Sequence, residues 1–345
     1  MADLDQLDKE IISIIQAQFP LEANPYDVLG ERFAISGDEL FSRVQKMYDA
    51  KLIRRLGAVF DSYHLGYRSA LCAISVPDEE KVQEVADFIS AYPQVTHNYY
   101  RPNKYNIWFT LTCASELERK VIFEEIAKKT GYSDILYLPA IRLYKIQVNF
   151  NLTDSKEADL KAPDSYREPG KIVVEEFDEL SKELVRQLQG NLIGQRQPFS
   201  FVAQEVNKKL ADELGYEINE TVVLQRMRNW KFNHTMRRFG ALLRHQKVGF
   251  SHNGMVVWNV PDEIAITVGT IMALQPEVSH CYERVRYKQW PYNMYTMVHG
   301  SSEEEVEAVA QRIVEDCRAQ GIDIAPEMIL CSTNEFKKVS MKYFL

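Results

Sequence analysis

The feature that most constrains the fold of this chain is an internal repeat. Residues 53–67, which contain Arg54-Arg55-Leu56-Gly57-Ala58, return at a spacing of 183 residues as 236–250, which contain Arg237-Arg238-Phe239-Gly240-Ala241. Residues 95–101 return at the same spacing as residues 278–284. The two halves must therefore share one set of secondary-structure elements, and we expect them to pack as an internal pseudo-dimer.

Each half opens on a pattern typical of three short helices. Apolar residues from Leu4 to Ile15 recur at helical spacing, and residues 180–188 repeat this stripe. Second helices are expected at about 26–33 and 199–213. Third helices begin near Ser36 and Asn219, which are favourable N-cap residues. Helices in this order predict a helix-turn-helix domain at the start of each half.

The pattern then changes to short strands and longer helices. In the first half we expect strands at 67–76, 95–100, 105–113 and 135–138, with helices at 79–91 and 115–130. In the second half strands are expected at 255–260, 277–283, 292–298 and 326–330, with helices at 262–274 and 302–320. The order βαββαβ predicts a ferredoxin-like domain in each half.

These patterns together predict an α+β protein, a tandem duplication of a helix-turn-helix plus a ferredoxin-like βαββαβ domain. Between the halves, residues 151–171 are rich in Asp, Lys, Ser and Pro and are expected to form a linker. The predicted domains are an N-terminal helix-turn-helix (1–55), a first ferredoxin-like domain (56–150), the linker, a second helix-turn-helix (172–238) and a second ferredoxin-like domain (239–345).

Composition limits the classes of partner. The chain has 41 basic and 49 acidic residues and a net charge of −8, which opposes nonspecific binding to nucleic acid. The third helix of the first half begins Ser36-Gly37-Asp38-Glu39, which places carboxylates where a DNA-binding helix needs side chains that contact bases. We expect no DNA partner. Exposed sheet edges of ferredoxin-like domains favour association, so a homo-oligomer is one expected state.

The sequence also bears on location. It contains no apolar stretch of roughly 20 residues, and its start is acidic, so we expect no membrane segment, no signal peptide and a cytoplasmic protein. The five cysteines are scattered and never form a C-x-x-C pair, which indicates neither a disulfide framework nor a zinc site.

Repeated polar residues suggest a ligand site. A single arginine pair is more often a surface charge or a phosphate contact, but Arg54-Arg55 and Arg237-Arg238 recur in both halves, each before a small Gly-Ala step. His97, Tyr99 and Arg101 alternate along one predicted strand and should share a face, as should His280, Tyr282 and Arg284 in the second half. Three polar groups on one face need partners, which favours a polar cavity over structural hydrogen bonding.

One histidine breaks the symmetry of the repeat. At the spacing of 183 residues His245 aligns with Ser62, and Arg244 aligns with Asp61, so only the second half pairs a cation with an imidazole there. His245 therefore marks the half that kept its chemistry, or it is an exposed histidine at a strand edge. His64, His234, His252 and His299 lack matched partners and are assigned to the surface or to packing.

The architecture resembles that of the Lrp/AsnC transcriptional regulators, and the motifs resemble those of the siroheme decarboxylases more closely. These motifs are Arg-Arg-x-Gly-Ala, the run from His97 to Thr110, and the run from Trp290 to Gly300. The resemblance covers nearly the whole chain and implies the form in which two related subunits are fused. It implies removal of the carboxyl groups from the acetate side chains at positions 12 and 18 of siroheme. The product, 12,18-didecarboxysiroheme, leads to heme or to heme d1.

The residues fit such a substrate. Siroheme carries eight carboxylates, which a protein binds with local clusters of arginine. His245 is expected to donate the proton that follows loss of carbon dioxide, with His97 as a second acid or a carboxylate contact. Either imidazole could instead ligate the iron. The expected substrate-binding residues are Arg54, Arg55, Arg237, Arg238, Tyr99, Arg101, His280, Tyr282, Arg284, Trp290, Tyr292, Asn106 and Asn293. No cofactor or catalytic metal is expected, because the iron belongs to the substrate.

Two other functions remain open from sequence. One is a ligand-responsive regulator of the Lrp/AsnC type, and the other is a protein that binds tetrapyrrole without converting it. A gel shift of promoter DNA would support the first, and stoichiometric siroheme binding without a mass change would support the second.

Overall fold

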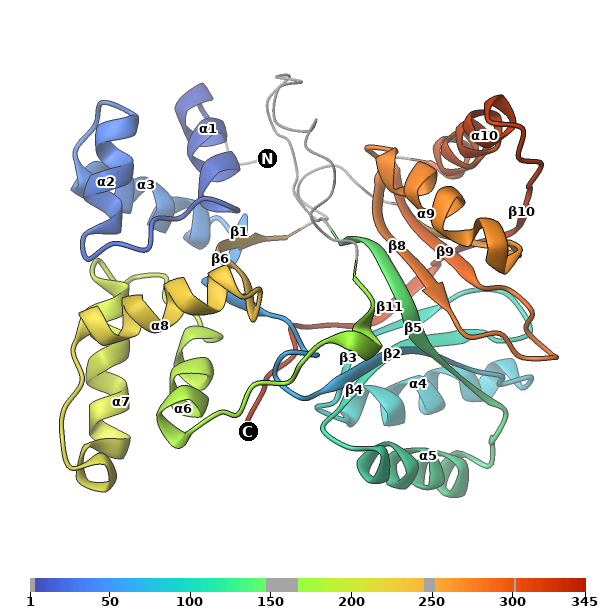
Figure 1. The fold of residues 1–345 in the computed structure, drawn as a ribbon, viewed down its shortest axis with the longest axis horizontal. Coiled ribbons are helices and arrows are strands. Elements are labelled where there is room, and N and C mark those ends of the chain that lie inside the picture. Colours follow the sequence, from blue (N-terminus) through green and yellow to red (C-terminus); the bar gives the residue numbers. More distant parts are fainter. Residues whose placement is uncertain (1–3, 147–166, 245–251, 301) are drawn as a thin grey trace.

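The structure is a computed structural model that describes residues 4–146, 167–244, 252–300 and 302–345 (Figure 1). The chain forms two regions that lie side by side. One region gathers helices from the start of both halves, and the other gathers the strands of the two predicted ferredoxin-like domains. The predicted linker, residues 151–171, lies largely outside the described residues.

The helical region contains both helix-turn-helix domains. Its helices are α1 (Gln6–Ile15), α2 (Pro25–Arg32), α3 (Gly37–Asp49), α6 (Glu179–Leu188), α7 (Pro198–Leu214) and α8 (Glu220–Phe232). Ser36 Oγ accepts a hydrogen bond from the Glu39 N–H, and Asn219 caps α8 in the same way, which confirms both predicted N-caps. Apolar residues from both domains form a single hydrophobic core, so the helices of the two halves pack as one unit.

A ribbon of two strands joins these domains. Strand β1 (Ile53–Phe60) pairs antiparallel with β6 (Met236–Leu243), with Gly57 opposite Gly240. Each glycine lies directly against the carbonyl end of a helix, since a Cβ on Gly57 would lie 2.5 Å from Gly190 O and one on Gly240 would lie 2.5 Å from Gln16 O. The ribbon packs in the helical core, so the predicted domain boundaries at 55/56 and 238/239 fall inside these strands.

The order βαββαβ is confirmed in both halves. The first half contains β2 (Arg68–Ile74), α4 (Val82–Ala91), β3 (Val95–Tyr100), β4 (Ile107–Cys113), α5 (Glu116–Thr130) and β5 (Ile135–Ile146). The second contains β7 (His252–Trp258), α9 (Ala265–Leu274), β8 (Val278–Arg284), β9 (Met294–Gly300), α10 (Glu303–Ala319) and β10 (Pro326–Cys331). The strand orders, β5-β2-β4-β3 and β10-β7-β9-β8, are the same for the two halves.

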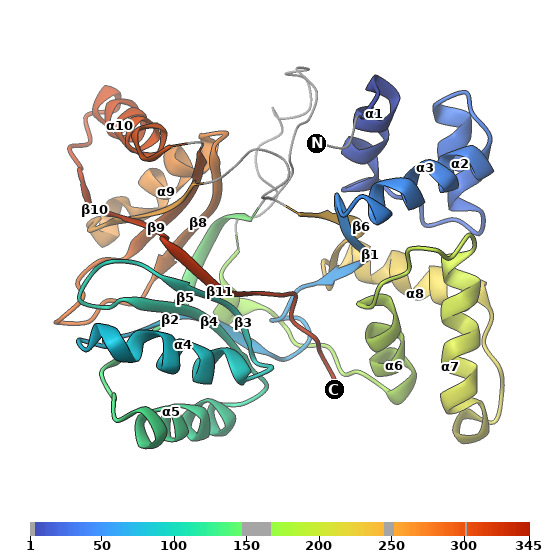
Figure 2. The same cartoon turned by 180° about the vertical axis from the view of Figure 1, so that it is seen from behind.

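The halves exchange strands at their sheet edges. Strand β5 pairs with β2 through its first residues and then with β8 of the second half through Ala140–Ile146. In return β11 (Asn334–Lys338) crosses from the second half to pair with β3 (Figure 2). Among the described residues these strands form one nine-stranded sheet. The expected end of the first domain's last strand at residue 138 was therefore too early, because β5 continues against a partner in the other half.

The sheet carries helices on its outer faces and a core between its inner faces. Helices α4 and α5 cover the strands of the first half, and α9 and α10 cover those of the second. The inner faces meet around aromatic residues that include Trp108, Trp290 and Tyr295. In the part of the chain that the structure describes, no helix has the length and apolarity to cross a membrane.

Candidate functional site

A cavity of about 700 Å³ lies where the β1–β6 ribbon faces the inner surface of the sheet. Residues of both halves line it, together with residues 338–341 and Tyr343 of the C-terminal tail. This volume lies within the range typical of small-molecule sites.

The walls of the cavity are strongly basic. Among the described residues its lining holds eight basic side chains and one carboxylate, that of Asp61. The basic residues are Arg54, Arg55, Arg101, Arg167, Arg237, Arg238, Arg284 and Lys338. In a chain of net charge −8 this concentration of positive charge is local, and it suits a ligand with several negative groups.

The two predicted rows of polar residues lie in the cavity wall. The rings of His97 and Tyr99 stack with centroids 6.3 Å apart, and Arg101 lies over the tyrosine ring at 5.6 Å. In the second half the rings of His280 and Tyr282 are 6.2 Å apart, and Arg284 lies at 4.3 Å from the Tyr282 ring. All six side chains line the cavity, as alternation along the strands predicted.

The two arginines of these rows also connect the halves. Arg101 donates hydrogen bonds to the carbonyl oxygens of Leu330 and Asn253 in the second half. Arg284 donates to the carbonyl oxygen of Leu138 in the first half, at 2.7 Å. These bonds fix both guanidinium groups, so the arginines define the shape of the wall as well as its charge.

Three histidines of the cavity are neutral at pH 7 in the absence of a ligand. Burial, and then the charges of Lys338 and Arg54, lower the pKa of His97 to about 4. Burial, followed by the charges of His299 and His97, lowers the pKa of His280 to about 3. Burial also lowers the pKa of His299 to about 4, and Lys338 and Arg101 add to this effect.

Hydroxyl groups orient two of the imidazoles. Thr96 Oγ1 lies 2.9 Å from Nδ1 of His97, and Ser279 Oγ lies 2.9 Å from Nδ1 of His280. In both halves the hydroxyl group lies beside Nδ1, so Nε2 is the ring nitrogen that does not have this hydroxyl partner.

The second arginine of each repeated pair binds the end of a helix. Arg55 donates to the carbonyl oxygens of Gln189 and Gly190 after α6, at 2.9 and 3.2 Å. Arg238 donates to Gln16 O after α1, at 2.8 Å. The carbonyl end of a helix carries partial negative charge, so these contacts tie the ribbon to the helices. Both arginines reach the cavity lining, but part of their donor capacity is used for this structural contact.

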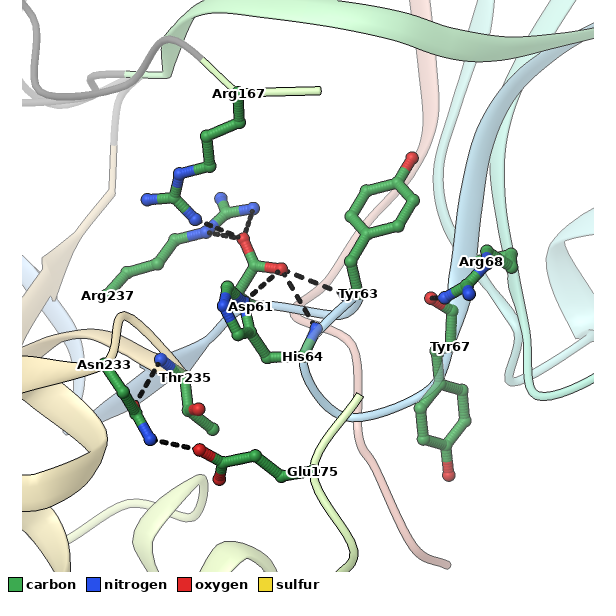
Figure 3. Close-up of polar contacts among 10 residues, drawn as sticks. All are labelled: Asp61, Tyr63, His64, Tyr67, Arg68, Arg167, Glu175, Asn233, Thr235 and Arg237. Atoms are coloured by element: carbon green, nitrogen blue, oxygen red, sulfur yellow. Dashed lines mark hydrogen bonds and ion pairs between the residues drawn. The ribbon is translucent and has the colours of Figure 1, made fainter. Parts of the chain in front are cut away.

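The first arginine of each pair has a different environment in each half. Arg54 donates to Ser340 Oγ at 2.8 Å. Arg237 donates through Nε and Nη2 to Asp61 Oδ2, at 3.1 and 3.0 Å (Figure 3). Arg167 donates to the same oxygen at 2.8 Å. The repeat thus places equivalent arginines in the cavity, but only Arg237 has a carboxylate partner among the described residues.

Four of the predicted binding residues are not among those that line the cavity, namely Asn106, Asn293, Trp290 and Tyr292. The side-chain amide of Asn106 bonds the backbone N–H and carbonyl of Val76, and Asn293 does the same with Val260. These amides clamp the chain that follows β2 and β7, a structural need that is the same in both halves.

Trp290 and Tyr292 belong to the aromatic core between the inner faces of the sheet. Trp290 is 3% exposed and packs on Tyr105, Trp108 and Tyr292. Its indole N–H donates to the Tyr295 hydroxyl at 2.8 Å. Trp290 and Tyr292 therefore fill this core and do not extend the cavity wall.

The predicted proton donor His245 lies outside the described residues, and its role stays a prediction. Sequence reasoning missed several lining residues, among them Arg167, His299 and Lys338. His299, assigned to the surface or packing, lines the cavity from β9, and Lys338 lines it from β11. Alternation along β9 carries a signal, because Tyr295, Met297 and His299 share the lining face. Lys338 had no comparable signal, since its position depends on the strand exchange.

The fold and the basic cavity define a two-fold repeat of a ligand-binding domain joined to helix-turn-helix domains. Residues 64–145 and 247–337 match the AsnC-like ligand binding domain, and residues 8–54 match the siroheme decarboxylase NirDL-like HTH domain. The siroheme decarboxylase of Hydrogenobacter thermophilus is 32% identical over 341 residues, which cover 99% of this chain and 95% of that protein. The chain therefore belongs to the siroheme decarboxylase family, in its fused NirDL-like form.

Structural and subunit comparisons agree with this assignment. The crystal structure of the siroheme decarboxylase NirDL superposes with a TM-score of 0.71 at 31% identity, and the match covers 99% of this chain and 95% of that one. That enzyme has also been solved in complex with an iron-uroporphyrin III analogue. The siroheme decarboxylase alpha subunit of Oleidesulfovibrio alaskensis is 45% identical over 157 residues, 46% of this chain and 94% of that subunit.

Proposed function

We propose that this protein is a carboxy-lyase that decarboxylates siroheme to 12,18-didecarboxysiroheme. The observation that carries this proposal is the cavity lining, in which the described residues present eight basic groups and one carboxylate. Eight carboxylates of the substrate supply the matching charge. Aromatic side chains of Tyr99, Tyr282 and Trp108 in the same lining offer apolar surface to the macrocycle.

The reaction converts each of the two reacting acetate side chains, at positions 12 and 18, into a methyl group. The bond between the methylene carbon and the carboxylate carbon breaks, carbon dioxide leaves, and the electron pair remains on the methylene carbon next to the pyrrole. That carbon then takes up one proton, so no oxidant or reductant is consumed. The protein must hold the carboxylate in position and place a proton donor next to the methylene carbon.

The histidines of the cavity become donors when the substrate binds. In the empty cavity His97 and His280 have pKa values of about 4 and about 3, so both are neutral. A substrate carboxylate beside either ring favours its charged form and raises its pKa. The substrate thereby recruits the proton that its own decarboxylation requires. Either ring could instead bind the iron of the substrate through Nε2.

His245 is proposed as the proton donor at one reacting acetate. It follows Arg244, whose backbone N–H donates to Leu52 O at 2.9 Å near the end of the ribbon. The ribbon ends beside the cavity, where Leu242 and Leu243 are lining residues. The proposal also includes a cytoplasmic location, no DNA partner and a homo-oligomer, all of which stay predictions from sequence.

The decisive experiment is an anaerobic incubation of the purified protein with siroheme, followed by mass spectrometry. Loss of two carboxyl groups per molecule is the expected result, and unchanged siroheme would refute the proposed activity. The variant His245→Ala tests the proposed donor, with His234→Ala as a matched control from outside the cavity lining. An unchanged rate for His245→Ala would exclude it as an essential acid.

A further inference from the structure

The β1–β6 ribbon relates the halves by a pseudo-two-fold axis that passes between Gly57 and Gly240. Beyond the ends of the ladder the Asp61 N–H donates to Thr235 O at 2.8 Å, and the Arg244 N–H donates to Leu52 O at 2.9 Å. These bonds are equivalent under the axis. Asp61 and Arg244 thus occupy matching backbone positions, with an acid in one half and a base in the other.

Asp61 pairs with two arginines at its end of the cavity. Its carboxylate, 1% exposed, accepts hydrogen bonds from Arg237 and Arg167, and His64 Nδ1 lies 3.3 Å from Oδ1 (Figure 3). Burial alone would raise the pKa of Asp61, but His64 and the two arginines hold it well below the usual range. Asp61 is therefore a permanent anion, and Arg237 is already engaged before any ligand arrives.

The equivalent end around Arg54 has the opposite character. In the described part of the chain Arg54 has a neutral partner, Ser340 Oγ, and forms no ion pair with a carboxylate. Burial, and then the charge of Arg244, lower the pKa of Arg54, and the charge of Glu335 opposes this effect. Burial also lowers the pKa of Lys338, where Glu335 again opposes the effect and the charge of Arg54 adds to it. Three positive groups, those of Arg54, Arg244 and Lys338, thus lie at this end, and the carboxylate of Glu335 lies 3.8 Å from Lys338. In the described part of the chain this carboxylate forms no ion pair with Arg54, whereas Asp61 pairs directly with Arg237.

We propose that Asp61 sets the orientation of the tetrapyrrole by cancelling one of two pseudo-equivalent carboxylate sites. A macrocycle with carboxylates on every side could enter a symmetric cavity in two orientations related by the pseudo-two-fold axis. Because Arg237 is paired with Asp61, the carboxylates of the ligand bind more favourably at the Arg54 end, and one orientation of the macrocycle is preferred. Orientation decides which acetates lie next to the proton donors. This inference rests on the proposed function.

The test compares two arginines that the repeat makes equivalent. Binding of iron uroporphyrin III to the full chain is titrated by absorbance for Arg54→Gln and for Arg237→Gln. Loss of a charge-assisted contact should weaken binding to Arg54→Gln by about tenfold or more. Arg237→Gln should weaken it by less than about threefold, because Asp61 already occupies that arginine.

Asp61→Asn supplies the second half of the test. The nearly isosteric amide removes the negative charge and releases Arg237 for the ligand. In this background Arg237→Gln should weaken binding about as strongly as Arg54→Gln. With siroheme as the substrate, the Asp61→Asn variant should also remove carboxyl groups from positions that the unaltered protein leaves intact. NMR of the products identifies these positions. A purely structural role would lower stability without changing which positions react.

Equal losses for the two arginine variants, or a larger loss for Arg237→Gln, would overturn the inference. That comparison does not require Asp61→Asn to fold. The failure of the proposed function has a different signature. A protein that binds iron uroporphyrin III with the expected asymmetry but leaves siroheme intact would be a tetrapyrrole-binding protein, and the role of Asp61 in orientation would stand.

Discussion

Ser279 Oγ lies 2.9 Å from Nδ1 of His280 and donates its own proton to Met297 O, 3.2 Å away. A hydroxyl has one proton to donate, so Ser279 must accept the hydrogen bond from the Nδ1–H of His280. The neutral ring therefore keeps Nε2 unprotonated, ready to accept a proton or to bind a metal.

The variant Ser279→Ala should lower the rate of siroheme decarboxylation by roughly 10-fold or more, because loss of an orienting partner misplaces the imidazole. Ser279→Thr is the matched control, since Thr96 fills the same role beside His97 in the first half. Single-turnover mass spectrometry measures both rates. Equal rates for Ser279→Ala and the unaltered protein would show that the hydroxyl does not orient a reacting group.

The buried histidines predict how stability depends on pH. In the unfolded chain a histidine binds a proton near pH 6.5, whereas His97, His280 and His299 stay neutral until about pH 3 to 4. Between about pH 6.5 and 4 the unfolded state binds more protons, so the free energy of unfolding should fall as the pH is lowered through this window.

Urea denaturation of the ligand-free protein at a series of pH values measures this dependence. His280→Gln removes one of the three groups and should make the slope shallower in the same window. A slope that is the same with and without His280 would contradict its burial as a neutral ring.

The ribbon glycines should not tolerate a methyl group. A Cβ at residue 57 would lie 2.5 Å from the carbonyl oxygen of Gly190, and one at residue 240 would lie 2.5 Å from Gln16 O. Gly57→Ala and Gly240→Ala should each lower the free energy of unfolding by about 1–3 kcal/mol, the usual cost of overpacking. Gly170→Ala is the control, because a Cβ there meets no atom within 4 Å. Thermal unfolding monitored by circular dichroism measures the stability of the three variants.

Lys338 is expected to contribute to ligand binding from the exchanged strand. Lys338→Gln should weaken the affinity for iron uroporphyrin III by about 10-fold, a charge-assisted contact being worth roughly 1.5–3 kcal/mol. Lys342→Gln, an exposed lysine of the same tail that is not a lining residue, should bind like the unaltered protein. Equal affinities for both variants would remove Lys338 from the binding surface.

The alternation of residues along a strand correctly predicted which side chains share a face, because a local pattern determines this geometry. His97, Tyr99 and Arg101 had to share a face because they alternate along one strand, and their equivalents in the second half had to do the same. The order of helices and strands followed from local periodicity for the same reason. Strand exchange was not predictable in this way, because the continuation of β5 depends on β8, a partner more than 130 residues later in the sequence.

Repetition alone did not separate binding residues from structural ones. Asn106 and Asn293 recur because each half needs the same backbone clamp, which is as good a reason to repeat as ligand binding. Arg55 and Arg238 recur partly because each half must hold a helix of the other. Asp61 had been noted as the counterpart of Arg244, but its contacts with Arg237 and Arg167 join segments more than 100 residues apart.

The exchanged strands have a consequence for whether such a protein must be encoded by one gene or can be encoded by two. Each half completes the sheet of the other through β5 and β11, so the peptide bond between the halves is not what holds them together. A gene split between the codons for residues 146 and 167 would yield two polypeptides that still need each other to cover their sheet edges. Co-expressed, they should assemble as an obligate heterodimer, and fusion or separation of the reading frame would leave the architecture unchanged.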